Sequence, residues 1–166
     1  MATHRHGCCV LQRCLDFATP AQKAALVDEI AAHALPLAQD AFGNYVVQYV
    51  LELGGPETRT AVMGQLAGRY AELSLQKFSS NVVERCLKLA GGEAGARDAV
   101  VRELIESPLL PRLLADSYGN YVVQSALGVA TGDLHAAVID AVRPHLPQLR
   151  GTPQGKRFLQ KISASM

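Results

Sequence analysis

The apolar residues of this chain recur with the period of an α-helix, and the helices that they predict recur along the chain. Val10, Leu11, Cys14 and Leu15 share one face of a predicted helix over residues 7–17, because positions three or four apart lie side by side on a helix. Helices of the same kind are predicted over residues 41–53, 76–89 and 116–129. The pattern therefore predicts an all-α fold.

A second group of helices is predicted between these helices. Thr19 and Pro20 supply a capping hydroxyl and a first-turn proline for a helix that Pro36 ends. Comparable helices are predicted over residues 57–66, from Val100 to the break at Ser107-Pro108, and from a cap at Thr131 up to Val142. The remaining breaks are assigned to a glycine stop at Gly54-Gly55-Pro56, a turn through Tyr70 and Leu73, a loose connector at 91–95, and Pro144 with Pro147.

One short string is repeated along the chain. FGNYVVQ at residues 42–48 recurs as YGNYVVQ at residues 118–124, and variants of it occupy residues 6–12, 78–84 and 154–160. The copies end at residues 12, 48, 84, 124 and 160, so the steps are 36, 36, 40 and 36 residues. A fixed period of this length is typical of a solenoid, in which each unit buries its apolar face against its neighbours. The connector at 91–95 is expected to hold the extra residues of the longer step.

These steps divide residues 1–166, taken as one domain, into successive units. We expect a half repeat at 1–18, full repeats at 19–54, 55–90 and 91–130, and a capping repeat at 131–166. No partner helix precedes the first helix in this sequence, so its apolar face is expected to be exposed. Either further repeats of a longer array or self-association would cover that face.

Each copy of the string places polar residues on one face of its helix. Asn44 and Gln48 are four residues apart and line up with Tyr45 beside them, whereas Val46 and Val47 point toward the core. Such a row can be simply the solvated side of an amphipathic helix. Solvated sides, however, carry Lys and Glu without a positional rule, whereas the fifth position here is Gln, Gln, Glu, Gln and Gln. The row therefore indicates a binding surface.

The repeated string and its period resemble those of the Pumilio (PUF) family of RNA-binding repeats over essentially the whole chain. The resemblance implies a right-handed α-solenoid of about 36-residue, three-helix repeats, related to armadillo-like stacks, in which each repeat reads one base. Positions one and five bond to a base edge, which selects Cys8, Gln12, Asn44, Gln48, Ser80, Glu84, Asn120 and Gln124. Position two stacks on bases, which selects Cys9, Tyr45, Asn81, Tyr121 and Arg157.

The same resemblance implies a sequence for the RNA. Asn with Gln reads uracil, Ser with Glu reads guanine, and Cys with Gln reads adenine. The chemistry agrees at guanine, because the Glu84 carboxylate only accepts hydrogen bonds and the guanine edge offers two donors. RNA runs antiparallel to the protein in this family, so the predicted site is 5′-UGUA-3′, with Asn120 and Gln124 at the 5′ base.

The last copy departs from the pattern, with Lys156, Arg157 and Gln160 in place of the usual residues. We expect it mainly to cap the stack. Arg157 is a candidate for stacking below the 5′ uracil, and Lys156 and Gln160 are candidates for an extra contact to phosphate or base. Lys77 is either a phosphate contact or an ordinary solubilising charge, and Cys9 replaces the flat side chain that is usual in the family.

Other chemistry finds little support in the sequence. The net charge of +1 argues against bulk electrostatic capture of nucleic acid but allows a local basic stripe. His4, His6, Cys8, Cys9 and Cys14 crowd into one terminus, whereas zinc sites use two separated pairs of ligands, so neither a metal nor another cofactor is predicted. No nucleophile signature or phosphate-binding glycine loop suggests an enzyme.

The sequence also bears on the cellular location. No stretch approaches the roughly 20 apolar residues of a membrane span, and nothing resembles a signal peptide. The adjacent Cys8 and Cys9 are not a disulfide framework, which favours a reducing compartment. We therefore expect a cytoplasmic protein.

The sequence leaves three functions open. The first is binding of UGUA in the 3′ untranslated regions of mRNA for repression or decay, with protein co-repressors on the convex face. The second is RNA binding in ribosomal RNA maturation, as in divergent relatives of the family. The third is a protein-binding helical scaffold. The intact four-base pattern favours the first.

Overall fold

The computed structural model of the chain describes residues 1–89 and 94–164. Within these residues it contains helices and no strand, so the predicted all-α solenoid is confirmed. The elements are α1 (Gly7–Phe17), α2 (Pro20–Ala32), α3 (Ala34–Gln39), α4 (Gly43–Leu53), α5 (Pro56–Leu66), α6 (Tyr70–Ser74), α7 (Ser79–Lys88), α8 (Ala94–Glu106), α9 (Leu110–Ala115), α10 (Gly119–Val129), α11 (Gly132–Val142), the 3₁₀ helix η1 (Arg143–Leu149) and α12 (Pro153–Ala164).

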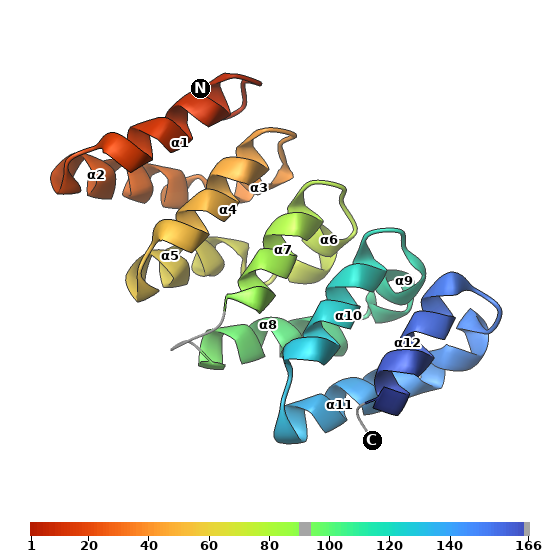
Figure 1. Ribbon diagram of the computed structural model, residues 1–166. Helices are drawn as coiled ribbons and strands as arrows, with labels where there is room; N and C mark the ends of the chain where they lie inside the picture. The colour runs from red at the N-terminus through yellow and green to blue at the C-terminus, as the bar shows by residue number, and fades with distance from the viewer. Residues whose placement is uncertain (90–93, 165–166) are drawn as a thin grey trace.

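The helices form rows that run the length of the molecule (Figure 1). The helices that carry the repeated string, α1, α4, α7, α10 and α12, each pack against the next and make one row. A second row contains α2, α5, α8 and α11. The short helices α3, α6 and α9 each pack against the first-row helix that follows them in sequence. The two chain ends lie at opposite ends of the stack, as expected of a solenoid.

The core lies between the rows and is built from small aliphatic side chains. Val46 and Val47 of α4 are fully buried, and the equivalent valines of α7 and α10 are buried to the same extent. Burial of one such side chain contributes about 1.5–3 kcal/mol. The repeated pair of valines therefore fixes which face of each helix turns inward, and leaves the residues beside it on the opposite face.

Side-chain caps set where the helices of the first row begin. The carboxylate of Asp40 accepts the backbone N–H groups of Phe42 and Gly43 at 2.9 and 2.8 Å. Asp116 does the same for Tyr118 and Gly119 at 2.8 and 2.9 Å. The predicted starts at residues 41, 76 and 116 were two or three residues early. At α4 and α10 the chain turns around these caps before the helix begins.

Three predicted breaks are in fact short helices. Pro36 does not end the preceding helix: α2 ends at Ala32, and Pro36 lies in the first turn of α3, where a missing N–H leaves no helical bond unmade. Tyr70 and Leu73 belong to α6 rather than to a turn, and both are buried. Pro144 and Pro147 likewise lie within η1.

Two predicted helix ends have a different cause from the one expected. Thr19 caps α2 as predicted, in a reciprocal capping box with Gln22, but the Thr131 side chain makes no capping hydrogen bond to α11. Gly54 follows α4 at φ −72°, outside the left-handed region of a glycine stop. A Cβ atom at Gly54 would lie 2.6 Å from Cβ of Thr58, so close packing of α5 requires the glycine.

The connector at 91–95 lies partly outside the described residues, which exclude 90–93. Ala94 and Gly95 belong to α8. The expectation that this connector holds the extra residues of the 40-residue step therefore stays a prediction.

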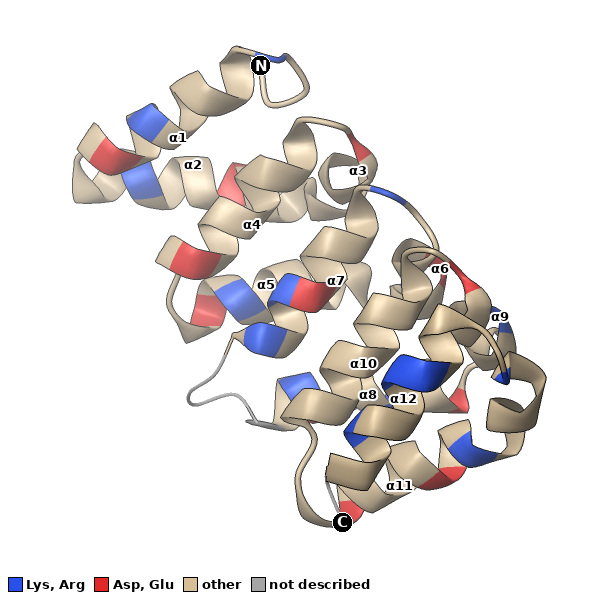
Figure 2. Ribbon diagram, turned by 45° about the vertical axis from the view of Figure 1, so that its right-hand side comes forward, with Lys and Arg blue, Asp and Glu red and all other residues tan. Residues whose placement is uncertain are grey.

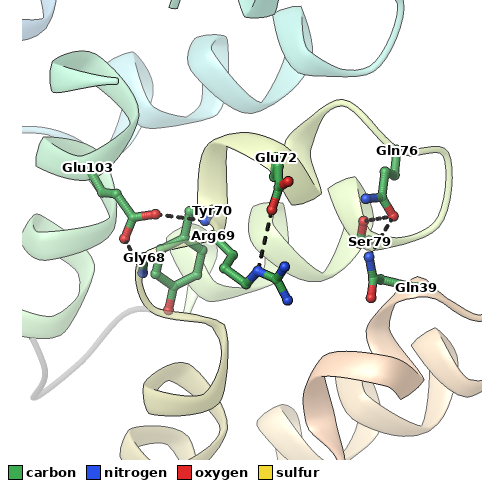
Figure 3. Close-up of polar contacts among 8 residues, drawn as sticks. All are labelled: Gln39, Gly68, Arg69, Tyr70, Glu72, Gln76, Ser79 and Glu103. Carbon is green, nitrogen blue, oxygen red and sulfur yellow. Dashed lines mark hydrogen bonds and ion pairs between the residues drawn. The ribbon is translucent and has the colours of Figure 1, made fainter. Parts of the chain in front are cut away.

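Polar contacts around α6 join it to the neighbouring units (Figure 3). Glu103 of α8 accepts the backbone N–H groups of Gly68 and Tyr70 at 2.8 and 2.7 Å. Gln39 donates to Gln76 at 3.2 Å across the preceding junction. Glu103 thus supplies, from the next unit, the cap that the N-terminus of α6 lacks in its own sequence.

The exposed face of α1 differs in part from the predicted one. Leu15 is fully buried against the second unit and Leu11 is half-buried, whereas Val10 and Phe17 are 49% and 81% exposed. Val10 and Phe17 line an open hollow on the outer side of α1, together with Cys9, Arg13 and Cys14. The apolar residues of α1 thus serve two faces, one toward α4 and one toward solvent. No described helix is long and apolar enough to cross a membrane.

Candidate nucleic-acid interface

The predicted site residues lie on α1, α4, α7, α10 and α12 in one repeating arrangement. The first position is buried in Cys8, Asn44, Ser80 and Asn120. The second position is exposed in all five helices: Cys9, Tyr45, Asn81, Tyr121 and Arg157. The fifth position is half-buried in Gln12, Gln48 and Glu84, buried in Gln124 and exposed in Gln160. The fold therefore brings the predicted residues of the first four copies into one row.

Asn44 and Gln48 form a hydrogen-bonded pair. Gln48 Nε2 donates to Asn44 Oδ1 at 3.1 Å, and Asn44 Nδ2 donates to the backbone carbonyls of Asp40 and Ala41 at 2.9 and 3.0 Å. Asn44 therefore fixes the orientation of the Gln48 amide. One N–H and the carbonyl oxygen of Gln48 remain for a ligand, which is one donor and one acceptor.

The pair on α10 is built in the same way. Gln124 Nε2 donates to Asn120 Oδ1 at 2.9 Å, and Asn120 Nδ2 donates to the backbone carbonyl of Asp116 at 2.6 Å. Gln124 is only 6% exposed, however, because α12 lies over it. The α10 position is therefore more enclosed than the α4 position.

Ser80 and Glu84 on α7 are not bonded to each other. Ser80 Oγ donates to the backbone carbonyl of Lys77 at 3.3 Å. Glu84 Oε1 accepts from Ser125 Oγ of α10 at 2.6 Å and lies 3.5 Å from Lys88 Nζ. The carboxylate is thus held from outside its own repeat.

The pair on α1 is also not joined by a hydrogen bond. Cys8 Sγ donates to the backbone carbonyl of Arg5 at 3.3 Å and lies 4.0 Å from Cys9 Sγ. Burial is the main cause of a raised pKa of the Cys8 thiol, so the group is neutral at pH 7. The Gln12 side chain makes no hydrogen bond within the described residues, so its whole amide is available to a ligand.

A hollow of about 420 Å³ separates neighbouring second-position side chains between α4 and α7. Its lining includes the Tyr45 ring, the Asn81 amide and the fifth-position side chains Gln48 and Glu84. A flat group inserted between Tyr45 and Asn81 would therefore meet hydrogen-bonding groups at its edge. A flat side chain beside amide and carboxylate groups is the combination on which proteins stack and hydrogen-bond an unpaired base.

The last copy of the string, on α12, contacts α10 and does not form a hydrogen-bonded pair like those on α4 and α10. Arg157 Nη1 donates to the hydroxyl of Tyr121 at 2.9 Å, and its guanidinium lies over the Tyr121 ring. Lys156 and Gln160 are exposed, and the described part of the chain shows no hydrogen bond between their side chains. Lys77 lies beside the Phe78 ring at 5.5 Å.

Charges along the row are mixed (Figure 2). Acidic and basic residues adjoin on α7, and α12 carries basic residues without acidic ones. Arg85 Nη1 pairs with Glu52 at 2.6 Å, which neutralises it in part. The described residues of the row thus form no long basic stripe. The row offers a ligand mainly specific polar contacts.

The residue after the fifth position links each first-row helix to the preceding one, a feature that the sequence analysis missed. Tyr49 donates to Asp16, Arg85 pairs with Glu52, Ser125 donates to Glu84, and Lys161 donates to the backbone carbonyl of Gln124. The only sequence signal is the constant place of these residues within the repeat, because their chemical types differ.

The described residues contain no group of three or more His, Cys, Asp or Glu that could hold a metal ion. Near the N-terminus, His4 Nδ1 accepts the backbone N–H groups of His6 and Gly7 at 3.2 and 3.3 Å. His4 thus has a structural role in starting α1.

A stack of three-helix units with one ordered row of base-sized polar sites defines a helical-repeat protein of the RNA-binding type. The model of the Pumilio-family RNA binding repeat matches residues 1–31, 33–67, 69–105 and 113–143. The chain belongs to the Pumilio family. The matched repeats begin at other residues than the repeats predicted from the sequence. The predicted repeat boundaries therefore stay a prediction.

Known proteins resemble the chain over nearly its whole length. It is 50% identical to Pumilio homolog 12 of Arabidopsis thaliana and 47% identical to a Pumilio domain-containing protein of Schizosaccharomyces pombe, over 99% and 98% of the chain. The chain spans only 27% and 24% of those two proteins.

Two solved structures share its fold and contain RNA. One is the Puf4 RNA binding domain bound to the HO endonuclease RNA 3′ UTR recognition sequence, with a TM-score of 0.87 and 40% identity over 96% of this chain and 52% of that one. The other is PUF-8 in complex with PBE-RNA, with a TM-score of 0.86 and 33% identity over 99% and 48%.

Proposed function

We propose that this chain binds single-stranded RNA through the row on α1, α4, α7 and α10, one base per repeat, and reads 5′-UGUA-3′. The observation that carries the proposal is the fixed Gln48 amide. It offers one donor and one acceptor at the edge of the hollow beside Tyr45, and the Watson–Crick edge of uracil presents the N3–H donor next to a carbonyl acceptor. The same pairing on α10 supports a second uracil two bases away.

The other two positions follow from their own groups. Glu84 presents a carboxylate, which accepts from the two donors of guanine. Cys8 is small and apolar and leaves the unpaired Gln12 amide to contact adenine. The RNA-bound relatives with the same fold support single-stranded RNA as the ligand.

In the cell, we propose that the sites lie in 3′ untranslated regions of mRNA, where binding leads to repression or decay. One of the similar structures holds a 3′ UTR recognition sequence, which favours this role. The proposal places the protein in the cytoplasm and assigns it no catalysis. Protein co-repressors would bind the convex face.

A binding assay with short RNAs tests the proposal. In a gel-shift experiment, we expect the chain to slow the migration of an RNA that contains UGUA flanked by an unstructured spacer. It should bind a scrambled RNA of the same composition much more weakly. Stacking contributes about 1–3 kcal/mol per base, and association and RNA ordering offset much of it, so the affinity for four bases should be on the order of micromolar. Equal binding to both RNAs would contradict the proposal and favour a protein-binding scaffold.

A further inference from the structure

The Glu84 carboxylate is held by a residue of the following repeat. Ser125 Oγ of α10 donates to Glu84 Oε1 of α7 at 2.6 Å, across 41 residues of sequence. Glu84 is half-buried, with 24% of its side chain exposed, and it lines the hollow beside Asn81. A charge-assisted bond this short is among the stronger hydrogen bonds of a protein.

The contact is special to this junction. The residues equivalent to Ser125 also reach back to the preceding helix, but they meet other partners. Tyr49 and Arg85 meet Asp16 and Glu52, which lie one turn beyond the fifth position, and Lys161 meets a backbone carbonyl. Of these four contacts between neighbouring helices, the one made by Ser125 reaches a side chain predicted to read a base.

A second group competes for the same oxygen. Lys88 Nζ lies 3.5 Å from Glu84 Oε1, one turn further along α7. Lys88 is 58% exposed and can follow the carboxylate as it moves. Without the serine, the carboxylate would be drawn along α7 toward Lys88. With the serine, Oε1 is fixed from the α10 side, and Oε2 and the second lone pair of Oε1 stay available to donors in the row.

We propose that Ser125 is a positioning residue that gives the preceding repeat its preference for guanine. It holds Glu84 so that the carboxylate meets the two donors of guanine in a fixed orientation. Ser125 itself need not touch the RNA. The inference rests on the proposed function, because it assigns guanine to Glu84.

The test compares Ser125→Ala with Ser125→Thr, which keeps the hydroxyl. Each variant and the unmodified chain are titrated with three RNAs: UGUA, UUUA, changed at the second base, and UGCA, changed at the third. We expect Ser125→Ala to reduce the preference for UGUA over UUUA about tenfold, the effect of losing one hydrogen bond to a charged group. The preference over UGCA, which is assigned to Gln48, should be unchanged. Ser125→Thr should keep both preferences.

The outcomes separate the two proposals. If the unmodified chain prefers UGUA over UUUA and Ser125→Ala keeps that preference, the role of Ser125 is wrong while the proposed function stands. If Ser125→Ala weakens both preferences equally, the residue is only structural and the inference is again wrong. If the unmodified chain does not distinguish the RNAs at all, the proposed function fails, and the inference fails with it.

Discussion

The guanidinium of Arg157 lies over the ring of Tyr121, with Cζ 5.3 Å from the ring centroid and Nη1 2.9 Å from the hydroxyl oxygen. The two residues occupy the same position in successive copies, 36 residues apart. The guanidinium thus lies over the face of the Tyr121 ring on which a base would stack. Arg157 is therefore placed to form the lower side of the site for the 5′ base.

The first prediction is that Arg157→Ala weakens binding of UGUA by about 3- to 10-fold, the effect of losing one stacking or cation–π contact at an exposed site. Binding of an RNA that lacks the 5′ uracil should be unaffected. Fluorescence titrations of both RNAs measure the difference. Arg150→Ala, which changes an exposed arginine just before α12, is the control. Equal losses on the two RNAs would show that Arg157 acts through overall charge.

The second prediction concerns the base read by α7. Ser80→Asn combined with Glu84→Gln should move the preference from UGUA to UUUA. The introduced asparagine can donate to the carbonyls of Gln76 and Lys77, as Asn44 does to those of Asp40 and Ala41. The half-buried Glu84 carboxylate facing uracil leaves a polar group unpaired, at about 1–3 kcal/mol, or roughly 10- to 100-fold in affinity.

Both proteins are titrated with both RNAs to check this exchange. The reverse change on α4, Asn44→Ser with Gln48→Glu, should move the preference from UGUA to UGGA and is the matched comparison. If the α7 variant still selects guanine at the second base, the assignment of residues to bases is wrong along the whole row.

The third prediction separates packing glycines from surface glycines. A Cβ atom at Gly119 would lie 2.9 Å from Cδ2 and from the carbonyl oxygen of Leu113, whereas a Cβ at Gly64 meets nothing within 4 Å. Gly119→Ala should lower the free energy of unfolding by about 1–3 kcal/mol. Gly64→Ala, inside α5, should raise it by about 0.4–1 kcal/mol. Urea unfolding of both variants measures the two changes, and a loss of stability in Gly64→Ala would be the contrary result.

The fourth prediction uses the reactivity of the thiols. Burial raises the pKa of Cys86 to about 12 and also raises the pKa of Cys8. Because the thiolate is the reactive form, both should resist alkylation in the folded protein. Cys9 and Cys14 are exposed and should react. Mass spectrometry after iodoacetamide treatment at pH 8 should find two adducts on the folded chain and four in denaturant. Rapid labelling of Cys86 without denaturant would contradict its burial.

The fifth prediction concerns the outer side of α1. Val10 is 49% exposed, whereas Val46, its equivalent on α4, is fully buried within the stack. We expect the chain to self-associate through this face at high concentration, because burial of apolar area is favourable. Light scattering over a concentration series should show association, and Val10→Asp should abolish it while Ala61→Asp, at an exposed position of α5, should not. A strict monomer at all concentrations would refute the prediction.

The sequence by itself determined the helices, their period and the row of polar positions. Asn44, Tyr45 and Gln48 were assigned to one exposed face and Val46 and Val47 to the core from spacing alone. The structure buries both valines, exposes Tyr45 and joins Gln48 to Asn44, but it buries Asn44 as well. This was possible because the signals are local. A helix places residues three and four apart together whatever the rest of the chain does, and the repeat supplies the same local signal several times.

The tertiary structure decided the contacts between units. Ser125 and Glu84 are 41 residues apart, and Arg157 and Tyr121 are 36 apart, so no local pattern relates them. The short helix α6 was missed as well, because its cap, Glu103, comes from the next unit. In a solenoid each unit completes its packing and its hydrogen bonds with a neighbour. The identity of the partner at each junction therefore depends on how closely the helices approach one another, which only the packed stack fixes.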